Sequence, residues 1–195
     1  MLLFPFLLLL ALVALANGSG GSACLPTPQD GSQLCITWSV ASSNITLNVL
    51  CVSPTSPPPA VGSVKWCAVG FAISPNAKYM FPANIVISSP LAGGGCTASD
   101  LISAKYSQPA CLDAQFSSVL ACGPSSGGVN AMNFTITRPL TVPAPAVSLV
   151  AGTAYNVIGA LSTSSQLPTG PVCPANAAFD IHESVFSGGP ALTFF

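Results

Sequence analysis

Charged residues are the scarcest feature of this chain. Lysine, arginine, aspartate and glutamate together make up 5% of its 195 residues, whereas about a quarter is usual for a soluble domain. Its only cations are Lys65, Lys78, Lys105 and Arg138. Because binding to nucleic acid needs a basic patch that neutralises phosphates, nucleic acid is excluded as a partner.

The motifs of several enzyme and metal-site classes are also missing. No serine lies in a recognisable strand-to-helix elbow, as a Ser-His-Asp hydrolase requires, and the acidic residues form no recognisable pair for acid–base catalysis. No two cysteines have the Cys-x-x-Cys spacing of a zinc ribbon or a thioredoxin site, and the Cys-x-x-Cys-His motif that attaches haem covalently is absent. These absences disfavour a conventional hydrolase and exclude a c-type cytochrome.

The chain opens with an apolar segment that ends in Ala14-Leu-Ala16, a pattern that signal peptidase accepts. This segment is shorter than the ~20 residues that span a bilayer. We therefore expect residues 1–16 to be a cleaved signal peptide rather than a transmembrane anchor, and residues 17–33 to be a flexible lead-in. The uncharged stretch from Arg138 to Asp180 is interrupted by prolines and glycines. A secreted, extracellular protein with no membrane span after cleavage is expected.

Eight cysteines in an exported chain predict an oxidising compartment and as many as four disulfides, whose connectivity the spacing leaves open. Two Asn-x-Thr sequons, at Asn44 and Asn133, are candidate N-glycan acceptors. The cysteines are Cys24, Cys35, Cys51, Cys67, Cys96, Cys111, Cys122 and Cys173.

Strand patterns recur from residue 34 onward. The clearest is residues 131–138, in which Met132, Phe134 and Ile136 alternate with polar residues. No segment has a sustained helical period, and turn residues separate the apolar segments. The pattern predicts an all-β fold, a disulfide-stapled two-sheet β-sandwich.

Two parts of the chain depart from simple alternation. Residues 65–73 are a nearly continuous apolar segment, which predicts a strand buried on both faces. Residues at about 93–128 are dense in Cys, Pro and Gly. We expect this second segment to be a loop-rich insertion at the periphery, held by disulfides rather than by a core.

Met80 and His182 would attract little notice by themselves. His182 is the only histidine, and a lone histidine is usually a solvated or packed residue. Met80 follows a turn and precedes a strand, where a methionine usually fills a gap in the core. Their interest comes from the order of the segments around them.

The segments follow one another in a particular order. They are Trp66-Cys-Ala-Val-Gly-Phe71, Lys78-Tyr-Met80, Ala83-Asn-Ile-Val-Ile, Phe134-Thr-Ile-Thr-Arg138-Pro-Leu140, Tyr155-Asn-Val-Ile-Gly-Ala160, and His182 with Gly188-Gly189. This order resembles the DOMON family, which has a Trp-x-Ala-x-Gly-Phe strand, a Met-centred turn and an apolar strand, then Phe-x-x-x-Arg-Pro-Leu, Tyr-x-x-Ile-x-Ala and a closing His before a Gly-containing turn. The resemblance covers about residues 34–195, and the insertion, Ala72 and Cys67 depart from it.

The resemblance implies a DOMON-type β-sandwich and, for the haem-binding branch, a haem b with Met80 and His182 as axial ligands. Thioether and imidazole ligands suit low-spin haem iron. The two segments are then expected to emerge at the same end of the sandwich. Arg138 is a candidate partner of a haem propionate, or else a surface charge at a strand end. The residues expected to line the slot, or to be ordinary core, are Trp66, Phe71, Phe81, Met132 and Tyr155.

The function expected from this resemblance is that of a secreted b-type cytochrome domain, which transfers single electrons to or from an extracellular redox partner or a small reductant. Such a protein is an electron-transfer domain rather than a self-contained catalyst. One alternative is a haem-free DOMON module that binds a sugar or another extracellular ligand. Another is a disulfide-stapled structural or cell-wall protein.

Overall fold

The protein is a sandwich of two antiparallel sheets. The computed structural model describes residues 19–25, 31–53, 64, 66–72, 83–91, 95–103, 109–124, 131–163, 173, 184–186 and 191–194. The strands are β1 (Gly20–Cys24), β2 (Gln33–Ala41), β3 (Asn44–Val52), β4 (Trp66–Ala72), β5 (Ala83–Pro90), β6 (Cys96–Ser103), β7 (Ala110–Cys111), β8 (Ser118–Pro124), β9 (Ala131–Pro139), β10 (Ala154–Ser162), β11 (Ser184–Phe186) and β12 (Leu192–Thr193). The predicted all-β fold is therefore confirmed.

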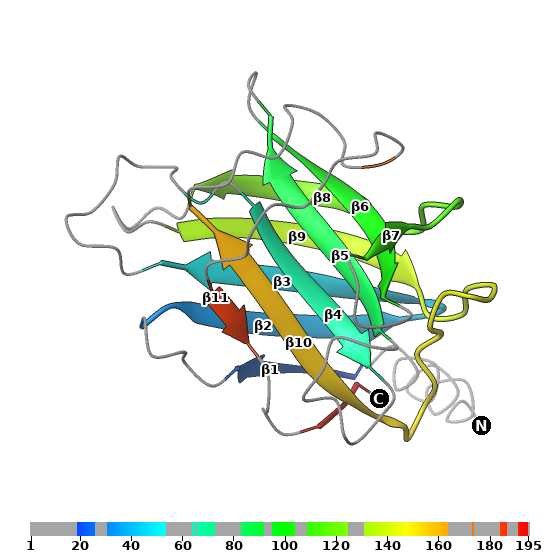
Figure 1. Ribbon diagram of the computed structural model, residues 1–195. Coiled ribbons are helices and arrows are strands. Elements are labelled where there is room, and N and C mark those ends of the chain that lie inside the picture. Colours follow the sequence, from blue (N-terminus) through cyan, green and yellow to red (C-terminus); the bar gives the residue numbers. More distant parts are fainter. Residues whose placement is uncertain are drawn as a thin grey trace, which may run out of the picture.

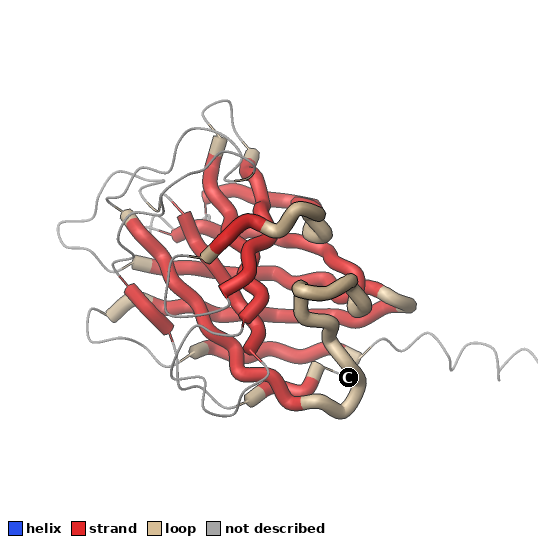
Figure 2. Tube along the Cα trace, turned by 45° about the vertical axis from the view of Figure 1, so that its right-hand side comes forward, coloured by secondary structure: helices blue, strands red, loops and turns tan. Residues whose placement is uncertain are grey.

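One sheet has five strands in the order β1-β2-β3-β9-β8. The other has seven, in the order β11-β10-β4-β5-β6-β7, with β12 paired to β10. Figure 1 shows β10, β4 and β5 crossing at an angle in front of the strands of the five-stranded sheet. Figure 2 shows only strands and loops in the described residues, where no helix that could cross a membrane is found.

Alternation explains the core between the sheets. On β3, Ile45, Leu47 and Val49 are fully buried, whereas Thr46 and Asn48 on the other face are partly exposed. A strand places successive side chains on opposite faces, and β2, β3 and β9 in this way contribute alternate residues to the core. The sharp turn into β3 occurs at Ser42, which has a positive φ of 55°.

The central strand β4 is buried on both faces, as its apolar sequence predicts. Cys67, Val69 and Phe71 pack in the core between the sheets. Trp66, Ala68 and Ala72 belong to a second apolar cluster with residues of β5, β6 and β10. We call the face that carries this second cluster, turned away from the five-stranded sheet, the outer face of the seven-stranded sheet.

Four disulfides connect the strands, and no described cysteine is free. Two of them join the sheets: Cys51–Cys67 links β3 to β4, and Cys96–Cys122 links β6 to β8. The others are Cys24–Cys35 within the β1–β2 pair and Cys111–Cys173 on the seven-stranded sheet. The even cysteine count thus reflects complete pairing.

Two expectations from the sequence are wrong. The described part of the 93–128 segment is not a loop-rich insertion, because β6 pairs with β5 along its whole length and β8 pairs with β9, although β7 and β8 do lie at the edges of their sheets. The lead-in at 17–33 contains β1, which pairs with β2. β1 could not be predicted, because Gly21 has no side chain to contribute to an alternation of apolar and polar residues. Only glycine fits at this position, since a Cβ would collide with the Trp38 ring.

Asp100 ties β6 to the loop that leads into β8. Its side chain is fully buried. One carboxylate oxygen accepts hydrogen bonds from the backbone N–H groups of Phe116 (2.7 Å) and Ser117 (2.6 Å), and the other accepts one from the Ser117 hydroxyl (2.7 Å). The buried carboxylate is therefore satisfied by the loop rather than by a cation.

We expect Asp100→Asn to lower the free energy of unfolding by about 2 kcal/mol, because a net 1.5–3 kcal/mol is typical of a hydrogen bond to a charged group. The amide NH₂ group cannot accept the bonds that the lost oxygen accepted. Asp113→Asn is the matched control, since Asp113 is exposed and such surface changes stay within about 0.5 kcal/mol. Urea unfolding measures both, and equal midpoints for the two variants would contradict the role of Asp100.

Candidate functional site

The outer face of the seven-stranded sheet carries a shallow apolar depression. Its volume is about 210 Å³, counting the space open to solvent. The surface that lines it is almost wholly apolar. Small residues of the central strand form its floor and larger side chains of the flanking strands form its sides. The lining residues are Ala68, Gly70, Ile85, Ile158, Gly159 and Ala160.

Gly70 lies in the middle of this floor. A Cβ atom at Gly70 would lie 2.9 Å from Cγ1 of Ile158 and 3.1 Å from Cγ1 of Ile85. Ala68 and Ala72 lie on the same face of β4 on either side of Gly70. From Ala68 to Ala72 the outer face of β4 therefore carries only small residues, with Ile85 and Ile158 packed close beside Gly70.

Met80 and His182 both lie outside the described residues, but the strands that flank them belong to this sheet. Met80 is in the connection between Ala72 of β4 and Ala83 of β5, two residues that pair with each other. His182 comes two residues before Ser184, which pairs with Leu161 of β10. Both segments therefore adjoin the strands that line the depression.

The expectation that both segments emerge at the same end concerns residues outside the described ones, but the residues that flank the segments lie toward opposite ends of β4. Leu161 pairs with Cys67 at the start of β4, whereas the Met80 connection leaves β4 at Ala72. Five residues of strand correspond to about 17 Å. The two segments thus join the sheet from opposite ends of β4, with the depression between those ends.

A disulfide attaches Cys173, which lies between β10 and β11 in the sequence, to the seven-stranded sheet. Cys173 is buried on the outer face, bonded to Cys111 of β7, and its backbone N–H donates to the Ser99 hydroxyl oxygen (3.3 Å). The segment between β10 and β11 is therefore attached to the β6–β7 side of the sheet midway along its length.

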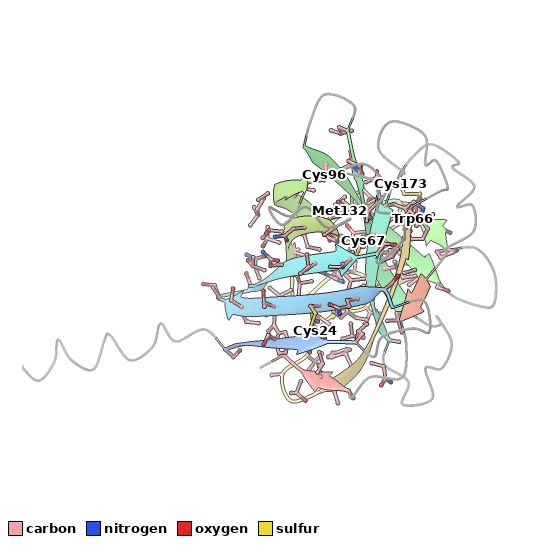
Figure 3. All side chains as sticks on the ribbon, turned by 90° about the vertical axis from the view of Figure 1, so that its left-hand side faces the viewer. Cys24, Trp66, Cys67, Cys96, Met132 and Cys173 are labelled. Atoms are coloured by element: carbon pink, nitrogen blue, oxygen red, sulfur yellow. A yellow bond between two sulfur atoms is a disulfide. The ribbon has the colours of Figure 1, made fainter. Side chains whose placement is uncertain are left out.

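The aromatic residues expected to line one slot lie on different faces. Trp66 belongs to the apolar cluster of the outer face. Phe71 and Tyr155 lie in the core between the sheets, as does Met132. Figure 3 shows Cys67 and Met132 between the sheets and Trp66 with Cys173 beyond the seven-stranded sheet. Of this set, only Trp66 shares a face with the depression, and Phe81 lies outside the described residues.

Arg138 also lies between the sheets, with 1% of its surface exposed. Its Nη2 donates to the Val147 carbonyl oxygen (3.0 Å), while Nε and Nη1 have no hydrogen-bond partner. Burial lowers the pKa of Arg138 below its usual value, and its electrostatic interactions with Asp100 and Tyr155 act in the opposite direction. Arg138 is thus not a surface charge, and it lies on the other side of the sheet from the depression.

Three buried side chains hold the segment that precedes β10. Arg138 binds the carbonyl of Val147, and Asn84 of β5 accepts a hydrogen bond from its N–H (2.7 Å). The Tyr155 hydroxyl donates to the Ser148 carbonyl (3.0 Å) and accepts from the Val150 N–H (2.6 Å). These contacts support a structural role for Arg138 and Tyr155 at this end of the sandwich.

Gly70, Ile85, Ile158 and Gly159 were not among the residues singled out from the sequence. Glycine and alanine in a strand have no functional group that would mark a binding site in the sequence. The isoleucines beside them cannot be told from ordinary core residues. One signal was available: every second position of β4 from Ala68 onward is small. Asn84 gave no signal, because its partner is backbone from a distant segment.

No family model matches the sequence, and no curated protein matches it. Two solved structures share the fold. The cytochrome b domain of pyranose dehydrogenase from Coprinopsis cinerea superposes with a TM-score of 0.57 at 11% identity, covering 83% of this chain and 77% of its own. The cytochrome domain of cellobiose dehydrogenase from Myriococcum thermophilum gives 0.57 at 12% identity, covering 89% of both chains. The predicted two-sheet β-sandwich is confirmed, and these cytochrome domains share the fold.

Proposed function

We propose that this protein is a secreted b-type cytochrome domain. It holds haem b over the outer face of the seven-stranded sheet, with Met80 and His182 as the axial ligands. It exchanges single electrons with an extracellular partner or a small reductant. The observation that carries the proposal is the depression over Gly70, because it is apolar, floored by small residues and flanked by the strands that continue into Met80 and His182.

The described residues fit a haem. Gly70 has no side chain, and Ile158 and Ile85 lie so close that a Cβ there would be 2.9 Å and 3.1 Å from their Cγ1 atoms, so the floor is low and apolar. Cofactor sites are mostly apolar and concave, with few polar groups, as this floor is. The fold shared with two cytochrome domains is consistent with this assignment.

Met80 and His182 would hold the haem iron through a thioether and an imidazole. Both come from segments whose flanking residues, Ala72 and Ser184, belong to the seven-stranded sheet. His182 binds as the neutral imidazole, and the Met80 thioether raises the reduction potential. When bound, haem b supplies a one-electron iron couple. With both axial positions occupied by side chains, electron transfer is favoured over oxygen chemistry.

Secretion is supported by the disulfides. Four disulfides need an oxidising compartment, which the cytosol does not provide. The apolar residues 1–16 supply the expected route.

Spectroelectrochemical titration of the haem-loaded full chain tests the function. We expect one reversible transition that fits a single electron, and no change in the reduced spectrum on addition of carbon monoxide. A transition that requires two electrons, or rapid carbon monoxide binding by the unmodified protein, would contradict an electron-transfer domain with two side-chain ligands.

A further inference from the structure

The outer face of the five-stranded sheet, the face turned away from the seven-stranded sheet, carries no charge. The five strands contain a single charged residue, Arg138, which points into the core. The outward positions are mostly hydroxyl and amide side chains at least partly exposed to solvent. They include Thr37, Ser39, Asn44, Thr46, Asn48, Ser118, Asn133, Thr135 and Thr137.

Both sequons lie on this face. Asn44 begins β3 beside Pro139 of β9, and Asn133 of β9 pairs with Leu50 of β3. The two asparagines are 89 residues apart in sequence but only six residues apart along β3, about 20 Å. Because each sequon threonine is two positions after its asparagine, Thr46 and Thr135 lie on the same face as well.

The surroundings of each asparagine leave room for a substituent. Asn44 is exposed beside the Ser42–Ser43 turn. Asn133 is partly exposed, its Oδ1 atom is buried without a hydrogen-bond partner, and its neighbour across the sheet is Gly123. A Cβ at Gly123 would have no atom within 4 Å. The space beside Asn133 is therefore open.

We infer that Asn44 and Asn133 are both N-glycan attachment sites and that their glycans together cover the uncharged face of the five-stranded sheet. In each reaction the asparagine Nδ2 attacks C1 of the first sugar of a lipid-pyrophosphate-linked oligosaccharide. A C–N bond forms, the C1–O bond breaks, the amide loses a proton and the lipid pyrophosphate leaves. Neutral hydrated glycans then supply the solubility that surface charge supplies in most proteins.

The arrangement divides the molecule into two sides. The glycan-covered face is turned away from the seven-stranded sheet, so the glycans project away from the depression over Gly70. This inference does not depend on haem, because the face and both sequons are defined by the five-stranded sheet alone.

Site occupancy is tested on the full chain secreted from a eukaryotic host. Treatment with peptide N-glycosidase should remove two glycans from the wild type, one each from Thr46→Ala and Thr135→Ala, and none from the double variant. Thr46→Ser and Thr135→Ser are matched controls that keep both the hydroxyl and the sequon, and they should lose two glycans. A wild-type protein whose mass does not change on treatment would overturn the inference. So would the loss of one glycan from every variant, the double variant included.

Coverage of the face is tested by hydroxyl-radical footprinting before and after the enzyme treatment. Leu120 and Val150 are large apolar side chains with 59% and 56% of their surface exposed. Leu120 is on β8 beside Ala121, which pairs with Thr135, whereas Val150 is in the loop before β10. We expect labelling of Leu120 to rise at least about two-fold on glycan removal and that of Val150 to stay constant. Equal changes at both residues would contradict coverage of this face.

Discussion

The His182→Ala variant is expected to lose most of its haem. A b-type cofactor has no covalent tether, so the axial ligands and the apolar surface hold it. Even outer-shell partners of metal ligands change affinity by about 10–100-fold, and we expect a loss of about 100-fold or more for the ligand itself. The measurement is haem retention, as Soret absorbance per protein after gel filtration. Added imidazole should restore part of the binding to the variant but not change the wild type. Full retention without imidazole would contradict ligation by His182.

Met80→Ala has a different expected result. It opens one axial position but leaves His182, so the haem should stay bound with a high-spin spectrum and a lower reduction potential. Met132→Ala is the matched control, because Met132 is buried in the core between the sheets. It should lower stability by about 2–5 kcal/mol and leave the spectrum low-spin. Identical spectra for the two variants would argue against Met80.

Gly70→Val is expected to have the second large effect. A Cβ at Gly70 already lies 2.9 Å from Ile158 and 3.1 Å from Ile85, so the valine must displace both side chains and fill the floor. Overpacking of this kind costs about 3 kcal/mol at the upper end of its usual range. We expect a lower unfolding midpoint and haem binding weakened by at least about ten-fold, measured by haem titration of the folded variant.

Gly123→Val is the control for this substitution. It also replaces a strand glycine, but a Cβ at Gly123 meets no atom within 4 Å. Valine favours strands and glycine weakens them, so stability should be unchanged or slightly higher and haem binding unaffected. If Gly70→Val bound haem as tightly as Gly123→Val, the depression over Gly70 would not be the cofactor site.

Most of the sandwich could be predicted because apolar and polar residues alternate along its inner strands. The pattern of Met132, Phe134 and Ile136 predicts β9, and the same alternation carried two residues further indicates that Arg138 points into the core. That signal was available but was outweighed by the usual preference of arginine for the surface. β6 and β8 were missed because small polar residues and cysteines stand where aliphatic residues usually mark a strand.

The faces of β4 could not be predicted from the sequence. A strand buried on both sides has no polar face, so periodicity does not show that Phe71 points into the core and Trp66 away from it. Only the pairing partners decide this, and they come from β5 and β10. The same holds for the ends of the sheet, since the ends at which the strands next to Met80 and His182 begin or end depend on long-range register.

Haem titration of the refolded or secreted full chain, followed by visible absorption, tests the central claim most directly. The account predicts uptake that saturates at one haem per chain and gives a low-spin, six-coordinate spectrum in both oxidation states. It also predicts that uptake weakens as the pH falls, because protons compete with iron for the imidazole of His182. A well-folded chain with all four disulfides formed that develops no Soret band with excess haem would contradict the assignment.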